Sequence, residues 1–254
     1  NVFFPDEVVF GNALCKISST LPPKDTKISD LPEVDVKLIR EVIDSAAEGY
    51  LHPEQQIKLL DAVGIQRVKE TVCDNKECLL KCAKDLGFPL VMKVVGPVHK
   101  SDVGGVVLNV RDNETLIREF ERMMQIPETK SIMLQTMASG MELFLGAKRE
   151  DSFGHMILCG MGGIFVEVIK DVKAGLSPLK KDEALEMIQS LKSYKLFEGV
   201  RGQAGIDENL FAEIITRLSA LMEAAPEIFE MDLNPLLGQG ASIIAVDARC
   251  NIAK

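Results

Sequence analysis

A lysine, a histidine and two adjacent glycines lie within the stretch VMKVVGPVHKSDVGG, residues 91–105. Lys93 sits in an apolar segment that reads as a strand, on the same face as the valines two residues before and after it. It is either an edge-strand lysine in solvent or a compact ammonium charge that meets phosphate oxygens in a cleft. Gly104 and Gly105 let backbone N–H groups approach an anion closely, although they also suit an ordinary turn into a strand. His99, one of three histidines in the chain, lies between these features.

Two further segments combine carboxylates with glycines. Glu142 opens the strand-like segment ELFLGAKR after the break MASG. It is either a solvated carboxylate at a strand end or an acceptor for the hydroxyl groups of a sugar. In GMGGIFVEVIKD, residues 160–171, the glycines suit a tight turn or a mobile loop that closes over a ligand. Glu167 interrupts the apolar run that follows, where a carboxylate needs a partner.

Asn234 and Asp247 form a candidate magnesium pair near the end of the chain. They belong to the segments EMDLNPLL and SIIAVDAR, which read as two strands joined by a Gly-rich turn. If the strands pair, both side chains point to one side. One amide oxygen and one carboxylate, completed by ligand phosphates and water, suit Mg²⁺. The alternative is that Asn234 only marks a turn before proline and that Asp247 is a charge at a strand end.

The elements that must position these residues alternate between helices and strands. Apolar spacing and glycine stops predict helices in the segments VKLIREVIDSAAEG, PEQQIKLLDAVGI, KECLLKCAKDLG, NETLIREFERMMQ, DEALEMIQSLKS and NLFAEIITRLSALMEAAP. Strands are predicted in PLVMKVV, VGGVVLNV, SIMLQTM, ELFLGAKR and HMILCGM. This mixture predicts an α/β (α+β) fold of two lobes, residues 36–130 and 131–254, with a ligand cleft between them. The polar residues 18–35, rich in proline and charge, read as a linker.

The bulk composition narrows the class of protein. The 254 residues are 46% hydrophobic and 26% charged, as in an ordinary soluble globular protein, and the net charge of −9 argues against nucleic acid as a main partner. No apolar run reaches the ~20 residues of a membrane span. The six cysteines contain no CxxC pair and predict reduced thiols of a cytoplasmic protein. Cys78 and Cys82 lie four residues apart on a predicted helix, a spacing that only weakly indicates metal binding.

Taken together, the motifs resemble a known family. Lys93, HKSDVGG, ELFLGAKR, GMGGIFVEVIKDV, LFEGVRG and EMDLNPLL…AVDAR occur in this order. They closely resemble the ATP-grasp β subunit or domain of the ADP-forming (NDP-forming) acyl-CoA synthetases, relatives of succinyl-CoA synthetase. The resemblance covers about residues 36–254 and implies the ATP-grasp fold, with a nucleotide cleft between its two lobes. The connection VVGPVHKSD looks shorter than the family's usual one, which bears on how far His99 reaches.

The resemblance also implies roles for individual residues. Lys93 matches the strand lysine that contacts the nucleotide phosphates, and His99 matches a histidine thought to be a second phosphoryl carrier. Neutral imidazole is a competent nucleophile at neutral pH, and the resulting phosphoramidate can give the phosphoryl group up again. The remaining matches are the phosphate-covering loop at Gly104 and Gly105, the adenine hinge at Gln135, Thr136 and Met137, the ribose-side Glu142, and the Mg²⁺ ligands Asn234 and Asp247.

The implied activity is the phosphoryl-transfer half of an acid–thiol ligase that uses ATP or ADP with Mg²⁺. Its partners are CoA-binding and ligase domains that carry the main phosphohistidine, in the same longer chain or as a separate subunit, and an oligomer is expected. Residues 1–17 are expected to be the tail of a preceding ligase–CoA domain. Two alternatives remain: another ATP-grasp carboxylate ligase, which needs no histidine in its cleft, and a nucleotide-sensing regulatory module fused to an acyltransferase.

Overall fold

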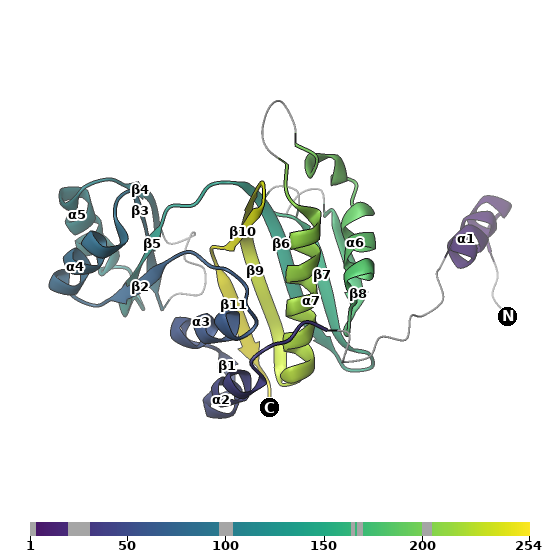
Figure 1. Ribbon diagram of the computed structural model, residues 1–254, viewed down its shortest axis with the longest axis horizontal. Helices are drawn as coiled ribbons and strands as arrows, with labels where there is room; N and C mark the ends of the chain where they lie inside the picture. Colours follow the sequence, from purple (N-terminus) through teal and green to yellow (C-terminus); the bar gives the residue numbers. More distant parts are fainter. Residues whose placement is uncertain (1–3, 20–30, 97–103, 164–165, 167–169, 200–204) are drawn as a thin grey trace.

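Two antiparallel sheets, each covered by helices, make up most of the chain (Figure 1). This computed structural model describes residues 4–19, 31–96, 104–163, 166, 170–199 and 205–254. The predicted mixture of helices and strands is confirmed. Among the described residues, no helix combines the length and the apolar character required to cross a membrane.

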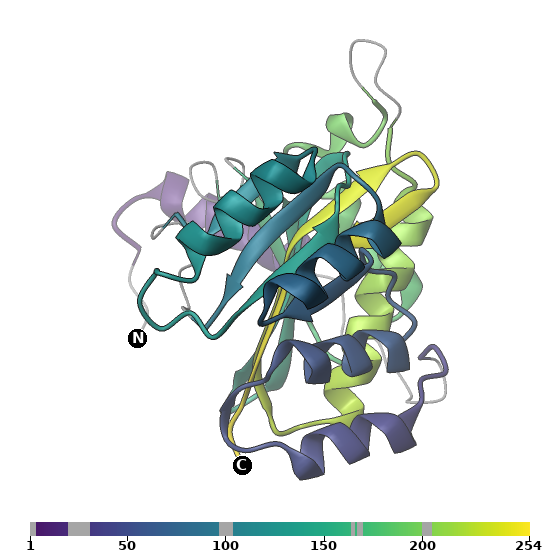
Figure 2. The same cartoon turned by 90° about the vertical axis from the view of Figure 1, so that its left-hand side faces the viewer.

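The small sheet has the strand order β2-β5-β3-β4. Its strands are β2 Glu70–Cys73, β3 Leu90–Val95, β4 Val106–Val110 and β5 Ser131–Thr136. Helices α4 (Lys76–Leu86) and α5 (Asn113–Met123) cover one face of this sheet, and Figure 2 shows them in front of it. Each helix begins where an N-cap side chain, Asn75 or Asp112, accepts a hydrogen bond from a backbone N–H of the first turn. The opposite face of the sheet is directed toward the rest of the molecule.

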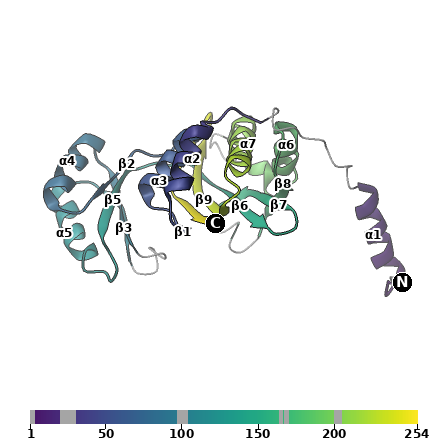
Figure 3. The same cartoon turned by 90° about the horizontal axis from the view of Figure 1, so that it is seen from below.

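The large sheet has the strand order β1-β11-β9-β6-β7-β8, and β10 pairs with β9. Helices α2, α3, α6 and α7 lie together on one of its faces (Figure 3) and share one apolar core with it. The strands are β1 Gly49–Tyr50, β6 Met141–Glu150, β7 Gly154–Met161, β8 Val172–Leu176, β9 Ile228–Gln239, β10 Ser242–Ala245 and β11 Ala248–Ile252. The helices are α2 Val36–Ser45, α3 Pro53–Ala62, α6 Lys181–Gln189 and α7 Glu208–Ala224, with the one-turn helix η3 at Tyr194–Leu196.

The division of the chain between the two sheets differs from the expected boundary between residues 130 and 131. Strand β5 belongs to the small sheet, where it pairs with β2 and β3. Helices α2 and α3 contribute to the core of the large lobe, and β1 pairs with β11 at the end of the chain. The small lobe therefore spans residues 70–136, and residues 36–65 pack with the large lobe. This difference arises from pairing between segments about 200 residues apart, which local sequence patterns do not report.

Helix α1 (Glu7–Ser19) is exposed along nearly all of its described length. Its exposed side chains include apolar ones, namely Val8, Val9, Phe10, Leu14 and Ile17. An amphipathic helix normally buries its apolar residues against another element. The two lobes described above therefore do not account for the sequence of α1.

Asp171 fixes the path of the chain after α6. The residue is 3% exposed, and its carboxylate accepts hydrogen bonds from the N–H groups of Lys192 (3.0 Å) and Ser193 (2.8 Å) and from the Ser193 hydroxyl. Burial works to raise the pKa of Asp171, but these hydrogen bonds outweigh it and hold the pKa below its ordinary value. The carboxylate is therefore a stabilising anion, since its charged form is better satisfied in the folded chain than in the unfolded one.

We expect Asp171→Asn to lower the free energy of unfolding at pH 7 by about 2 kcal/mol, the scale of a hydrogen bond to a charged group. Because the pKa is depressed in the folded state, this stabilisation is present above the ordinary pKa of 3.8 and is lost as the pH falls through the folded value. Urea unfolding at pH 7 and pH 3 measures the effect. An equal difference in the free energy of unfolding between wild type and variant at both pH values would contradict this prediction. Asp151→Asn, at an exposed turn residue, is the control.

Candidate functional site

Lys93 points away from the core of the small lobe and toward the large lobe. Leu90, Met92 and Val94 of its strand belong to the small-lobe core, so Lys93 lies on the other face, as the alternation predicted. The side chain is 8% exposed, and its Nζ donates a hydrogen bond to the carbonyl oxygen of Val246 at 3.0 Å. Nζ also lies 3.9 Å from Oδ1 of Asp247. Lys93 is therefore not an edge-strand lysine in solvent, since β3 lies between β5 and β4 and the side chain is buried against the large lobe. Its contact with phosphate oxygens stays a prediction.

The carbonyl of Val246 receives a second hydrogen bond from the small lobe. Nε2 of Gln135 on β5 donates to it at 3.1 Å and also donates to the carboxylate of Glu70 on β2. Burial raises the pKa of Glu70 above its ordinary value, although the hydrogen bond from Gln135 works in the opposite direction. Val246 lies between β10 and β11, so three strands of the small sheet and one turn of the large lobe meet at this point.

The predicted pair Asn234 and Asp247 is brought together by strand register. β9 runs antiparallel to β10 and β11 in one continuous register. Carried across the two residues that link β10 to β11, this register puts Asn234 opposite Asp247. The N–H of Val246 donates to the carbonyl of Pro235 at 3.1 Å, as this pairing requires. Opposite residues on antiparallel strands project from the same face, so both side chains are directed to one side of the large sheet.

Asp232 is a second acidic residue on this face, beside Asp247, and the sequence analysis did not select it. It precedes Asn234 by two residues on β9, so the two side chains project from the same face. Burial raises the pKa of Asp232 to about 6 against the influence of Arg249, and the nearby carboxylates of Asp247 and Glu230 add to the rise. Its buried Oδ1 accepts no hydrogen bond within the described part of the chain. The period-two spacing from Asn234 was the signal available in the sequence.

This donor set fits a hard divalent cation. Two carboxylates and an amide oxygen are the ligand types that Mg²⁺ prefers. A cation here would satisfy the orphaned Oδ1 of Asp232 and offset the repulsion between Asp232 and Asp247. The residues therefore have the chemistry to bind Mg²⁺, and the roles of Asn234 and Asp247 as ligands stay a prediction.

Glu142 lies on β6, in contact with the loop that follows β7. Its carbonyl accepts a hydrogen bond from the N–H of Gly162 at 2.7 Å. A Cβ atom added at Gly163 would lie 2.4 Å from Oε2 of Glu142, and Gly163 has a φ of +58°. The glycine pair thus allows the loop to approach an exposed carboxylate closely. Of the predicted glycine-rich segment, Glu167 lies outside the described residues.

The remaining predicted residues surround the small sheet. The carbonyl of Gly105 accepts a hydrogen bond from the N–H of Val94 at 2.9 Å, beside Lys93. Gly104 adopts a φ of +66°, the left-handed conformation that favours glycine. Thr136 ends β5, and the exposed Met137 begins the connection to β6 in the large lobe. Their role as an adenine hinge stays a prediction. His99 lies outside the described residues.

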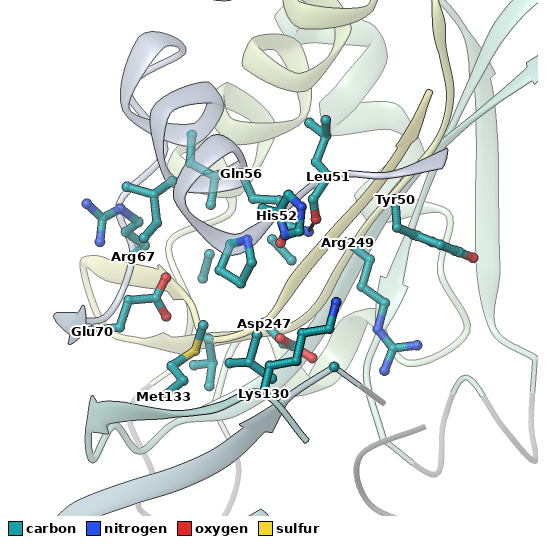
Figure 4. Close-up of a pocket in the computed structure, with 18 residues that line it drawn as sticks. Tyr50, Leu51, His52, Gln56, Arg67, Glu70, Lys130, Met133, Asp247 and Arg249 are labelled. Carbon is teal, nitrogen blue, oxygen red and sulfur yellow. Dashed lines mark hydrogen bonds between the residues drawn. The ribbon is translucent and has the colours of Figure 1, made fainter. Parts of the chain in front are cut away.

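A cavity of about 230 Å³ adjoins the contact between the lobes. Figure 4 shows Glu70, Met133 and Lys130 of the small lobe on one side, and His52 and Gln56 at the start of α3 on the other. Asp247 also lines it, as do two arginines, Arg67 and Arg249. Apart from Asp247, the sequence analysis singled out none of these as candidate site residues, because they come from segments far apart in the chain. The cavity combines cations, carboxylates and apolar walls, which suits a small polar ligand.

Comparison with known proteins gives a consistent picture. Residues 42–252 match the ATP-grasp domain family. The chain is 40% identical over 194 residues to an ADP-forming acetate–CoA ligase II of Archaeoglobus fulgidus, covering 75% of this chain and 28% of that protein. It is 36% identical over 222 residues to the β subunit of an ADP-forming acetate–CoA ligase I of Pyrococcus furiosus, covering 83% of this chain and 96% of that subunit. It thus spans under a third of the Archaeoglobus ligase but nearly the whole Pyrococcus subunit.

Solved structures agree with the sequence matches. The acetyl-coenzyme A synthetase 1 of Ca. Korarchaeum cryptofilum, described as dinucleotide forming and in complex with coenzyme A, Ca-AMPCP and HgCl⁺, superposes with a TM-score of 0.80 at 31% identity. The match covers 85% of this chain and 99% of that one. A second structure of that protein, with coenzyme A and Mg-AMPPCP and a phosphohistidine segment pointing toward the nucleotide site, has a TM-score of 0.74 at 31% identity and covers 86% of this chain and all of that one.

Proposed function

Because this chain belongs to the ATP-grasp domain family, we propose that it is the nucleotide-binding, phosphoryl-transfer part of an ADP-forming acyl-CoA synthetase. The complete reaction converts acyl-CoA, ADP and phosphate into a carboxylic acid, CoA and ATP. The observation that carries the proposal is the contact of Lys93 with the turn that bears Asp247, which lies opposite Asn234. The alignment with the Pyrococcus ligase β subunit covers 96% of that subunit.

In the proposed mechanism, Lys93 binds phosphate oxygens of the nucleotide and screens their negative charge. Phosphoryl transfer is largely a problem of position and electrostatics, so a buried ammonium directed into the cleft contributes to both. Asn234, Asp247 and Asp232 would hold Mg²⁺, which supplies further charge screening when bound. Gly104 and Gly105 border the phosphates, Glu142 accepts hydrogen bonds from the ribose, and the backbone of residues 135–137 meets the adenine.

His99 is the proposed phosphoryl carrier. A neutral imidazole nitrogen attacks the γ-phosphorus of ATP, a P–N bond forms, the bond to the β-phosphate oxygen breaks, and ADP leaves. In the opposite direction, ADP attacks the phosphohistidine, and the histidine is regenerated. A phosphohistidine segment that points toward the nucleotide site in the Korarchaeum relative supports a relay of this kind.

The partners follow from the same proposal. CoA-binding and ligase domains that carry the main phosphohistidine would act with this chain, in one longer polypeptide or as a separate subunit. The Archaeoglobus and Pyrococcus relatives illustrate both arrangements, since the match covers 28% of one and 96% of the other. The exposed apolar residues of α1 support the proposal that residues 1–17 are the tail of a preceding domain. Cytoplasmic location and an oligomeric assembly are parts of this proposal.

Incubation of the 254-residue chain with Mg²⁺ and ATP labelled at the γ-phosphate tests the function. We expect a label on the protein that is labile in acid and stable in base, as a phosphoramidate is. Addition of ADP should remove the label by accepting the phosphoryl group, which forms labelled ATP. Loss of the label in His99→Ala but not in His52→Asn would support the carrier assignment, whereas the reverse result would overturn it. Phosphoryl transfer to a carboxylate without any labelled protein would favour another ATP-grasp ligase. Nucleotide binding without any transfer would favour a regulatory module.

A further inference from the structure

Three cysteine thiols meet at the junction of β2 and α4, on the side of the small sheet away from the cleft. The Sγ atom of Cys78 lies 3.3 Å from Sγ of Cys73 and 3.8 Å from Sγ of Cys82. All three sulfur atoms lie within 4.8 Å of one another. Cys73 ends β2, and the other two are one turn apart on α4, so the site joins a strand to the helix that follows it.

The distances between the sulfur atoms fit a shared metal ion. Zinc binds thiolate sulfur at about 2.3 Å, which sets sulfur–sulfur separations near 3.8 Å for tetrahedral and about 4.0 Å for trigonal coordination. The observed separations of 3.3 and 3.8 Å, with an upper limit of 4.8 Å, lie around these values. A small adjustment of side-chain torsions is therefore enough to direct all three sulfur atoms at one point.

The surroundings favour a soft cation at this point. Cys73 is 1% exposed and belongs to the small-lobe core, while Cys78 and Cys82 are half-buried, which leaves a route of entry for an ion. Cys78 lies in the first turn of α4, where its N–H donates to the Oδ1 of Asn75 at 2.9 Å. Three sulfur ligands select thiophilic ions such as Zn²⁺ and Cu⁺ over Mg²⁺.

We propose that Cys73, Cys78 and Cys82 bind one thiophilic d¹⁰ metal cation, of which Zn²⁺ is the representative. On binding, each thiol gives its proton to solvent and its sulfur becomes a ligand, and water completes the coordination of zinc on the half-exposed side. The site is separate from the nucleotide cleft, because successive residues of β2 alternate faces. Glu70 reaches the cleft, whereas Cys73, three residues later, faces α4. The bound ion would tie β2 to α4 and stiffen the small lobe.

Titration of the reduced, metal-stripped 254-residue chain with Cd²⁺ tests the site. We expect one equivalent to bind with a sulfur-to-cadmium charge-transfer band in the ultraviolet, and Zn²⁺ to displace it. X-ray absorption of the zinc form should show three sulfur neighbours at about 2.3 Å. Cys78→Ser and Cys82→Ser should each weaken binding by at least about 100-fold, because even residues that only support a ligand change affinity about 10–100-fold.

Cys15→Ser and Cys250→Ser serve as matched controls and should leave the titration unchanged, because Cys15 lies on α1 and Cys250 is buried in the large lobe. Cys78→Ala is a second variant if the serine exchange perturbs α4, with circular dichroism as the check on folding. Unaltered binding in the Cys78 and Cys82 variants would overturn the proposal. Rapid formation of a disulfide between Cys73 and Cys78 in the presence of Cd²⁺ would also overturn it. No nucleotide is present in this titration, so its outcome is independent of the proposed phosphoryl transfer.

Discussion

Replacement of Lys93 by methionine is expected to lower the rate of protein labelling by ATP by about 100-fold or more, the usual cost of removing one charge-stabilising donor from a transition state. Methionine has a similar length and tolerates a buried position, so the fold should survive. The carbonyl of Val246 also keeps its hydrogen bond from Gln135. The measurement is the initial rate of acid-labile labelling at saturating Mg²⁺, together with thermal unfolding of the variant.

Lys84→Met is the matched control, because Lys84 is an exposed residue of α4 on the outer surface of the small lobe. Its labelling rate should equal that of the wild type. A Lys93 variant that unfolds at the wild-type temperature and labels at the wild-type rate would show that the ammonium serves only the contact between the lobes. That result would contradict the proposed role of Lys93 in binding phosphate.

Asp247→Asn is expected to raise the Mg²⁺ concentration needed for half-maximal labelling by at least about 10-fold, and to lower the maximal rate by about 100-fold. The exchange keeps the shape of the side chain but removes one negative charge from a face where Asp232 has a pKa raised to about 6. In the apo protein the same exchange relieves repulsion, so the pKa of Asp232 should fall. A titration of labelling against Mg²⁺ measures the first effect.

Asp247 also lies 3.9 Å from Nζ of Lys93, so its substitution could act through the lysine instead of a metal. The two routes predict different results. If Asp247 is a ligand, the Mg²⁺ concentration for half-maximal labelling rises in Asp247→Asn and is unchanged in Lys93→Met. If Asp247 acts through Lys93, both variants label more slowly and neither changes that Mg²⁺ concentration. Asp151→Asn, at an exposed turn residue, again provides the control with wild-type Mg²⁺ dependence.

Local patterns in the sequence predicted the elements and the direction of several side chains. The alternation of PLVMKVV placed Lys93 on the face that it shares with the valines two residues away, and the structure shows that this face is opposite the small-lobe core. The Gly-rich turn at residues 238–240 predicted the pairing that puts Asn234 opposite Asp247. These features depend on neighbours along the chain or on one short hairpin. Periodicity and turn chemistry are therefore sufficient to report them.

Features that join distant segments were missed or only partly seen. The pairing of β1 with β11 moves residues 36–65 into the large lobe, and no local pattern in either segment specifies the other. Arg67, Lys130 and Arg249 were not selected from the sequence, because only the fold brings them to one cavity. Cys78 and Cys82 gave a weak signal because the third thiol, Cys73, precedes the helix and lies on a separate strand.

The carbonyl of Val246 has a consequence for how ligand occupancy and lobe separation are linked. Lys93 and Gln135, on two different strands of the small lobe, both donate to this single oxygen of the large lobe. Rotation of the small lobe away from the large one must therefore break both hydrogen bonds together and expose this half-buried carbonyl. In the proposed mechanism, a nucleotide that draws the Lys93 ammonium toward its phosphates competes for the hydrogen bond to Val246. If Lys93 has its proposed role, nucleotide binding and the contact between the lobes are coupled, and by thermodynamic reciprocity each changes the free energy of the other by the same amount.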